Sequence, residues 1–387
     1  MNLVVEQEDL PNILTITPAT IVTELPVINI QAIPSEFENM MFSYHSKIIV
    51  DGQMTSINTA GVIQLHEQKI EFEIRGRSSV GAEYPLKSLG VTFETPVNPL
   101  ASLGLHPKKI RPGHHLDFLR TTRLRSSGND FGVTMIKDLA YSRFAVENKL
   151  NFEFMYGSPV QVFVNEMYYG LMNVRTESSL LGMAFLLDAD TSLMGMLKVK
   201  DHSENLKFDE GNRLACEDLL TAIDTEDAAA IWDNVDIDNF IDYIIYQDYI
   251  GNADWANNIK AFNPGNGKFR FILYDVDLAG NAAIIPLLPK LEFISADIGK
   301  IYRALQKNEG FDDRLNQRQK ALYQSFSVQD FNTIVDELAA TIENDIPYLV
   351  AKYEMPESSL HWKLEIEQLK LDFEGRDRSI RKKYDLE

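Results

Sequence analysis

The spacing of apolar residues changes along this chain, and that change is the feature that most constrains its fold. In the first half, Ile70, Phe72 and Ile74 alternate with charged residues, which is the period-two pattern of a half-buried strand. In the second half, the segment 235–249 carries its apolar residues at helical spacing, and Gly251 is placed to end that helix. Strands in front and helices behind predict an α+β fold with two lobes and a cleft between them.

The same patterns predict the order of the elements. Four prolines divide the first 40 residues into short segments, so this lead-in is expected to be extended. Strands are predicted at 27–30, 69–75, 89–93, 117–125, 160–164, 168–175 and 268–274, and helices at 133–149, 235–249, from about 295 onward and at 360–382. The predicted organisation is an N-terminal segment at 1–40, a β-rich lobe at 41–195, a second lobe at 196–312 and a helical extension at 313–387.

Composition excludes several kinds of partner and site. The 387 residues carry a formal net charge of -20, which argues against nucleic acid or an anionic membrane as the main partner. The single cysteine, Cys216, allows no internal disulfide and no thiolate-rich metal site. No apolar run approaches the ~18 residues of a membrane span. The start of the chain lacks the pattern of a signal peptide, so the protein is expected to stay inside the cell unless a leader was removed.

Two acidic segments in the second half have the residue types that phosphoryl transfer requires. Asp254 precedes the amide pair Asn257 and Asn258, and an apolar strand-like run ends on Asp275 and Asp277. One carboxylate could orient a hydroxyl group while the other oxygen ligands hold Mg²⁺ or Mn²⁺ against the phosphates of ATP. The alternative for Asp254 is an ordinary loop residue that caps the next segment. Residues at i and i+2 face opposite ways on a strand, so both late carboxylates can bind one ion only if the strand ends there.

Lys87 could point into the cleft or out to water. It shares the predicted buried strand face of Leu89, Val91 and Phe93. Burying an ammonium group is costly unless an anion meets it. Lys87 could therefore bind ATP phosphates, or it could be a first-position lysine whose amine reaches solvent.

The loop before Lys87 is rich in small residues and is flanked by Arg75. Segment 76–82 contains Ser78 and Ser79, and small residues let backbone N–H groups approach a phosphate. Many hairpin loops have this composition without such a role. The arginines at 75, 123 and 125 suit phosphate binding, although ion pairs with acids such as Asp138 are the default expectation.

These motifs resemble those of the spore coat protein H (CotH) kinase family, whose members are atypical protein kinases with a reduced kinase-like fold. The resemblance covers roughly 45–355, and it rests on motifs in the family's order: Arg75-Gly-Arg-Ser-Ser, Tyr84-Pro-Leu-Lys-Ser, Arg125-Ser-Ser-Gly-Asn-Asp, Tyr168-Tyr-Gly-Leu-Met-Asn-Val-Arg, Ile250-Gly-Asn-Ala-Asp-Trp-Ala-Asn-Asn and Phe271-Ile-Leu-Tyr-Asp-Val-Asp, with Phe311 and Arg314 in the later helices.

The resemblance implies a role for each matching residue. Lys87 would bind the nucleotide phosphates, aided by Arg75 and the loop serines. Asp254 would act as the hydroxyl-orienting base, Asp275 as the main Mg²⁺ ligand and Asn258, or its neighbour, as a second ligand. Asp277 would be a further ligand or lie just outside the metal's ligands.

The chain departs from the family at the glutamate expected to pair with the lysine. Family members usually have Arg-Glu, whereas this chain has Arg175-Thr176-Glu177. Moving a residue by one position along a strand turns its side chain to the opposite face of the sheet, unless a β-bulge restores the original face. The expected function is a Mg-ATP-dependent kinase that phosphorylates Ser or Thr of a protein. The alternative is a catalytically silent kinase-like scaffold or assembly protein of a bacterial surface or coat.

Overall fold

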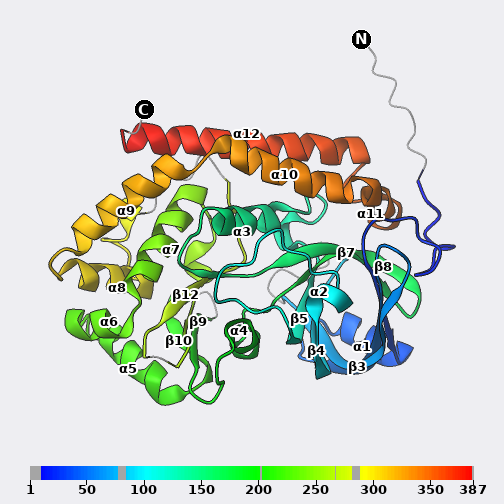
Figure 1. Cartoon of the computed structure of the whole chain (residues 1–387), viewed down its shortest axis with the longest axis horizontal. Helices are drawn as coiled ribbons and strands as arrows, with labels where there is room; N and C mark the ends of the chain where they lie inside the picture. The colour runs from blue at the N-terminus through cyan, green and yellow to red at the C-terminus, as the bar shows by residue number, and fades with distance from the viewer. Residues whose placement is uncertain (1–9, 77–83, 201–202, 266, 281–287, 386–387) are drawn as a thin grey trace, which may run out of the picture.

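The computed structural model describes residues 10–76, 84–200, 203–265, 267–280 and 288–385. The fold is α+β, as predicted: strands dominate the N-terminal region and helices the C-terminal region (Figure 1). The barrel strands lie at one end of the molecule and α5–α9 at the other. Buried residues from both ends belong to one large hydrophobic cluster.

Seven of the described strands close into a barrel. Their order is β1 (Val27–Ala32), β2 (Ile49–Ile57), β3 (Ile63–Arg75), β4 (Ser88–Val97), β5 (Leu119–Arg125), β8 (Met167–Arg175) and β7 (Gly157–Val164), and β7 returns to β1. All neighbours are antiparallel except β1 and β7, which are parallel. The alternation in β3 is confirmed, because Ile70, Phe72 and Ile74 are all buried. Closure removes the exposed strand edges that an open sheet would have.

A second sheet of five short strands lies among the helices. Its order is β10 (Leu206–Gly211), β9 (Gly195–Val199), β11 (Lys260–Asn263), β12 (Arg270–Leu273) and β6 (Glu153–Phe154). Of these strands, only β12 is predicted from the sequence. Strands β6, β9 and β11 are short and mostly buried along their whole length, and β10 is mostly exposed or half-buried, so all four lack the alternation that reveals a half-buried strand.

The helices cover the barrel and the second sheet. They are α1 (Pro34–Phe42), α2 (Pro99–Ser102), α3 (Lys137–Glu147), α4 (Leu180–Leu187), α5 (Arg213–Asp224), α6 (Ala228–Asn234), α7 (Ile237–Ile250), α8 (Asp297–Gln306), α9 (Phe311–Ser325), α10 (Val328–Ile342), α11 (Ile346–Tyr353) and α12 (Ser359–Lys383). The expectation of an extended lead-in is wrong at α1. Pro34 lies in the first turn, where its missing N–H costs nothing, so this proline begins a helix.

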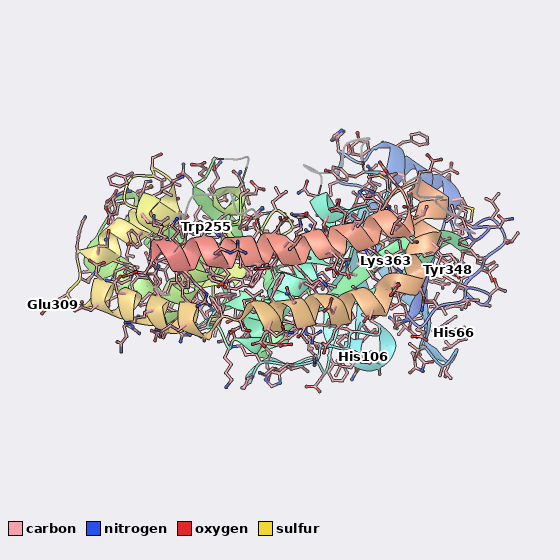
Figure 2. All side chains as sticks on the ribbon, turned by 90° about the horizontal axis from the view of Figure 1, so that it is seen from above. His66, His106, Trp255, Glu309, Tyr348 and Lys363 are labelled. Atoms are coloured by element: carbon pink, nitrogen blue, oxygen red, sulfur yellow. The ribbon has the colours of Figure 1, made fainter. Side chains whose placement is uncertain are left out.

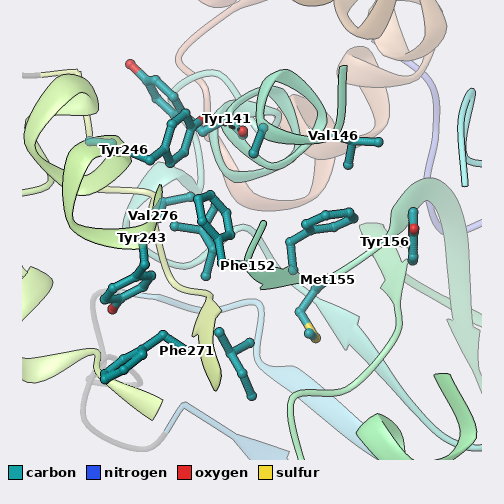
Figure 3. Close-up of a cluster of buried hydrophobic side chains, with 14 of the residues drawn as sticks. Tyr141, Val146, Phe152, Met155, Tyr156, Tyr243, Tyr246, Phe271 and Val276 are labelled. Atoms are coloured by element: carbon teal, nitrogen blue, oxygen red, sulfur yellow. Dashed lines mark hydrogen bonds between the residues drawn. The ribbon is translucent and has the colours of Figure 1, made fainter. Parts of the chain in front are cut away.

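The long helix α12 joins the two ends of the molecule. Seen from above, it runs along much of the molecule's length beside α10 (Figure 2). Phe373 of α12 stacks on Phe331 of α10 with ring centroids 3.7 Å apart. Beneath these helices, Tyr141, Tyr243 and Tyr246 belong to a cluster of buried side chains around α3 and α7 (Figure 3). Among the helices that the structure describes, none has the length and apolar character needed to cross a bilayer.

Candidate functional site

The two acidic motifs lie side by side because their backbones are hydrogen-bonded to each other. Helix α7 ends at Gly251, which has the left-handed φ of 59°. The N–H of Gly280 donates to the carbonyl of Ile250 at 2.8 Å, and the N–H of Ala253 to the carbonyl of Leu278 at 3.4 Å. These bonds hold the turn that carries Asp254 against the segment that follows β12.

Asp254 is bound by the two amides that follow it. Its Oδ1 accepts from Nδ2 of Asn257 at 2.7 Å, and its Oδ2 accepts from Nδ2 of Asn258 at 2.9 Å. The neighbouring Trp255 is buried and donates its indole N–H to the hydroxyl of Tyr243 at 3.2 Å. Since both amides donate through nitrogen, their carbonyl oxygens are the atoms that could act as metal ligands.

Asp275 and Asp277 converge on one arginine. Strand β12 ends at Leu273, and Asp275 has a left-handed φ of 57°. Nη2 of Arg125 lies 2.6 Å from Oδ1 of Asp275 and 2.9 Å from Oδ2 of Asp277. Because the strand ends before Asp275, the two carboxylates do not point to opposite faces of the sheet, and both reach the same arginine. Asp adopts this left-handed conformation more readily than most other non-glycine residues.

A third carboxylate, Asp138 of α3, completes this charged cluster. Its Oδ2 lies 3.4 Å from Nη2 of Arg125, and its Oδ1 accepts from Arg175. Burial lowers the pKa of Arg125, but the nearby carboxylates raise it more, so its pKa is above the ordinary value. Burial and then repulsion from Asp275 raise the pKa of Asp277 to about 7. Three carboxylates therefore share two guanidinium groups, and the cluster can accept further positive charge.

A small cavity of about 60 Å³ lies beside this cluster. Its lining includes Arg75, Arg123, Arg125 and Asp275. The Nε–H groups of Arg75 and Arg125 are buried, and they have no hydrogen-bond partner among the described residues. Guanidinium groups that line a cavity suit phosphate oxygens, because their planar set of donors matches phosphate geometry. These residues therefore suit the phosphates of a nucleotide.

The acidic residues also fit a hard divalent cation. Within the described ranges, no three or more His, Cys, Asp or Glu side chains are arranged as a complete metal site. Mg²⁺ is usually held by one or two carboxylates together with substrate phosphates and water. The converging oxygens of Asp275 and Asp277 meet that need without a third protein ligand.

Lys87 and Glu177 contact the following described residues. Nζ of Lys87 donates to the carbonyl of Tyr84 at 2.7 Å and lies 4.7 Å from the ring centre of Tyr44, and burial lowers its pKa. Oε1 of Glu177 accepts from Nε of Arg123 at 3.0 Å. Strand β8 ends at residue 175, so Glu177 is not on a strand. The expected turn of its side chain to the opposite strand face therefore does not apply.

A model of the CotH kinase protein family matches residues 72–380. The chain belongs to the CotH kinase family. Among curated proteins, no match was found. The matched residues include the charged cluster and the Asp254 turn.

In this CotH kinase family chain, the predicted site residues form two groups. Asp254 contacts Asn258, and Asp275 meets Asp277 through Arg125. Arg75 lines the cavity beside Asp275, whereas Lys87 contacts the two tyrosines named above. The predicted loop residues Ser78 and Ser79 lie outside the described residues.

Other charged residues of this CotH kinase family member are not predicted from the sequence. Nζ of Lys260 donates to the carbonyl and Oγ of Ser178 at 2.9 and 2.8 Å and lies 5.0 Å from the ring centre of Tyr274. Burial and the nearby charge of Lys198 lower the pKa of Lys260 to about 7. The two lysines are register partners on β11 and β9. In the sequence, each of these lysines stands within an apolar run. Only the pairing of β11 with β9 shows that the two lysines are neighbours.

Proposed function

We propose that this chain is a Mg²⁺- or Mn²⁺-dependent protein kinase that transfers the γ-phosphoryl group of ATP to Ser or Thr of a protein. One observation carries the proposal: Asp275 and Asp277 converge on Arg125 beside an arginine-lined cavity, next to the Asp254 turn. The barrel and the helical region would then be the two lobes of a reduced kinase-like fold. Family membership supports this assignment.

Each group at the site has a distinct role in the proposed reaction. Asp275, Asp277 and an amide oxygen of Asn258 or Asn257 would hold the metal ion, which neutralises phosphate charge when bound. Arg75, together with Arg125, would bind phosphate oxygens. Holding these groups in place before the reaction stabilises the charge that develops on the transferring phosphoryl group.

Asp254 would orient the acceptor hydroxyl group. Its carboxylate is fixed by two amide donors, so little freedom is lost when the hydroxyl binds. As general base, it would accept the hydroxyl proton while the oxygen attacks phosphorus and the bond to the ADP oxygen breaks.

A catalytically silent scaffold is the second candidate. The observation in its favour is that Glu177 pairs with Arg123, while Lys87 contacts Tyr84 and Tyr44. Such a protein could keep the fold and the nucleotide cavity without transferring phosphate.

Transfer of radiolabelled phosphate from ATP, with Mn²⁺ or Mg²⁺ and a serine-rich protein acceptor, separates the candidates. We expect labelling by the natural chain and loss of labelling in Asp275→Ala. Asp254→Ala should lower the rate by about 10²–10⁴-fold, the usual contribution of a general base. Asp117→Ala, at a side chain that is 76% exposed, serves as the control. Equal labelling by Asp275→Ala would overturn the proposal, and ATP binding without transfer would favour the scaffold.

A further inference from the structure

A second cavity, of about 280 Å³, lies where the barrel, α3 and α10 meet. Barrel residues 157–159, two turns of α3 and the end of α10 contribute to its walls. Among the described residues, it shares no lining side chain with the cavity beside Asp275. Its volume is close to the lower end of the ~300–1,000 Å³ range of ligand pockets, so it suits a small molecule.

The walls of this second cavity are apolar. Leu139 and Val146 of α3 line it together with Met155 and Tyr156, and all four residues are buried. Val146, Met155 and Tyr156 belong to the buried cluster drawn in Figure 3. An apolar group bound here would be removed from water, which is favourable by about 25 cal/mol per Å² of buried apolar surface.

The rim of the second cavity is cationic. Lys108, Lys109 and Arg143 line it together with one acidic lining residue, Glu24. Two acids outside the lining also pair with these cations: Glu337 with Lys108 and Arg143, and Glu147 with Arg143 at 2.8 Å. The cations of this rim suit a carboxylate that takes the place of one of the acids already bound to them.

A carboxylate of the protein already binds two of these cations. Nζ of Lys108 lies 2.6 and 2.8 Å from the two carboxylate oxygens of Glu337, and Arg143 pairs with the same carboxylate. The side chains of Lys108 and Glu337 are 56% and 41% exposed, whereas that of Arg143 is 18% exposed. Exposed ion pairs contribute only about 0–1 kcal/mol, so the pair of Glu337 with Lys108 can be exchanged at little cost. A carboxylate that replaces Glu337 must also pair with the less exposed Arg143.

We propose that the second cavity binds a small amphipathic carboxylate, with its apolar body against α3 and its charged group on Lys108 and Arg143 in place of Glu337. The ligand would contact a helix that reaches the charged cluster. Arg175 pairs with Asp138 of α3, and its Nη2 lies 3.4 Å from Oγ of Ser142, which lines the second cavity. The binding itself does not depend on the proposed kinase activity.

Calorimetric titration of the full chain with octanoate tests this site, with octylamine and octanol as probes of equal chain length. We expect octanoate to bind, octanol to bind more weakly and octylamine not to bind. Thr341→Trp places a large side chain at an exposed lining position of α10, and we expect it to abolish octanoate binding. Octylamine binding as tight as octanoate, or octanoate binding that Thr341→Trp leaves unchanged, would overturn the proposal.

Glu337→Gln tests the exchange of carboxylates. Removing the competing charge should tighten octanoate binding about two- to fivefold, as expected for loss of an exposed ion pair. Glu343→Gln is a matched control, because Glu343 forms an exposed ion pair with Lys363 at 2.6 Å and does not line the cavity. If Glu337→Gln binds octanoate no more tightly than the control, the proposed replacement of Glu337 is wrong.

Discussion

At the scale of single residues, Arg125 decides how the acidic cluster is held. Its guanidinium contacts Asp275, Asp277 and Asp138, and its side chain is only 11% exposed. Removing one partner of a buried ion pair leaves uncompensated charge and commonly costs about 3–5 kcal/mol. A divalent cation bound by the same carboxylates would replace the missing positive charge.

Arg125→Gln should therefore lower the free energy of unfolding by about 3 kcal/mol, measured in urea. Mn²⁺ should restore more stability to Arg125→Gln than it adds to the natural chain. Arg213→Gln, at a side chain that is 63% exposed, controls for the loss of an arginine. Equal effects of Mn²⁺ on Arg125→Gln and Arg213→Gln would contradict metal binding by these carboxylates.

At the scale of elements, the short 3₁₀ helix at Gly128–Asp130 supports Asp277. The N–H of Asn129 donates to Oδ2 of Asp277 at 3.0 Å, and Gly128 has a φ of 63°. A Cβ atom at Gly128 would overlap Oδ2 of Asp277. This turn therefore requires glycine for its conformation and for the space next to the carboxylate.

Gly128→Ala should weaken Mn²⁺ binding and destabilise the fold. Gly61→Ala is the matched control, because Gly61 has a φ of 74° and nothing lies within 4 Å of its added Cβ. Both variants carry backbone strain of about 1–2 kcal/mol, but only Gly128→Ala displaces Asp277. Titration with Mn²⁺ checks this, and equal affinities in the two variants would show that the turn does not position the site.

Strand β6 joins β12 through a buried charged cluster around Glu153. Its carboxylate contacts His114 at 2.6 Å and Arg270 at 2.8 Å. Burial raises the pKa of Glu153, but the hydrogen bond from His114 and the charge of Arg270 lower it to about 2. Because the folded pKa is below the unfolded value, this stabilisation is present above about pH 4.5 and is lost as the pH falls toward 2.

The natural chain should consequently lose about 3 kcal/mol of unfolding free energy between pH 4.5 and 2 through Glu153, in addition to other groups. Glu153→Gln should be less stable at pH 7 and should lose less over that acidic range. Glu357→Gln, at a side chain that is 86% exposed, should follow the natural curve. Parallel pH curves for the natural chain and Glu153→Gln would show that this ion cluster does not stabilise the β6–β12 pair.

At the scale of the whole molecule, local periodicity predicts the elements better than their pairing. The barrel strand with Ile70, Phe72 and Ile74 and the helix that ends at Gly251 follow from spacing. Strands β6, β9, β10 and β11 of the second sheet are short and have no such signal. The convergence of Asp275 and Asp277 depends on Arg125, 150 residues away in sequence, so no local pattern contains it.

The central claim is that the Asp275–Asp277 cluster binds metal and nucleotide together, and thermal melting with Mn²⁺ and ATP tests it most directly. At a hundred times the dissociation constant, ligand should add about 2.7 kcal/mol of stability to the natural chain and to Asp117→Ala. Asp275→Ala should fold, but ATP and Mn²⁺ together should add no stability to it. A melting temperature of the natural chain that millimolar ATP and Mn²⁺ leave unchanged, or an equal increase in Asp275→Ala, would contradict the claim.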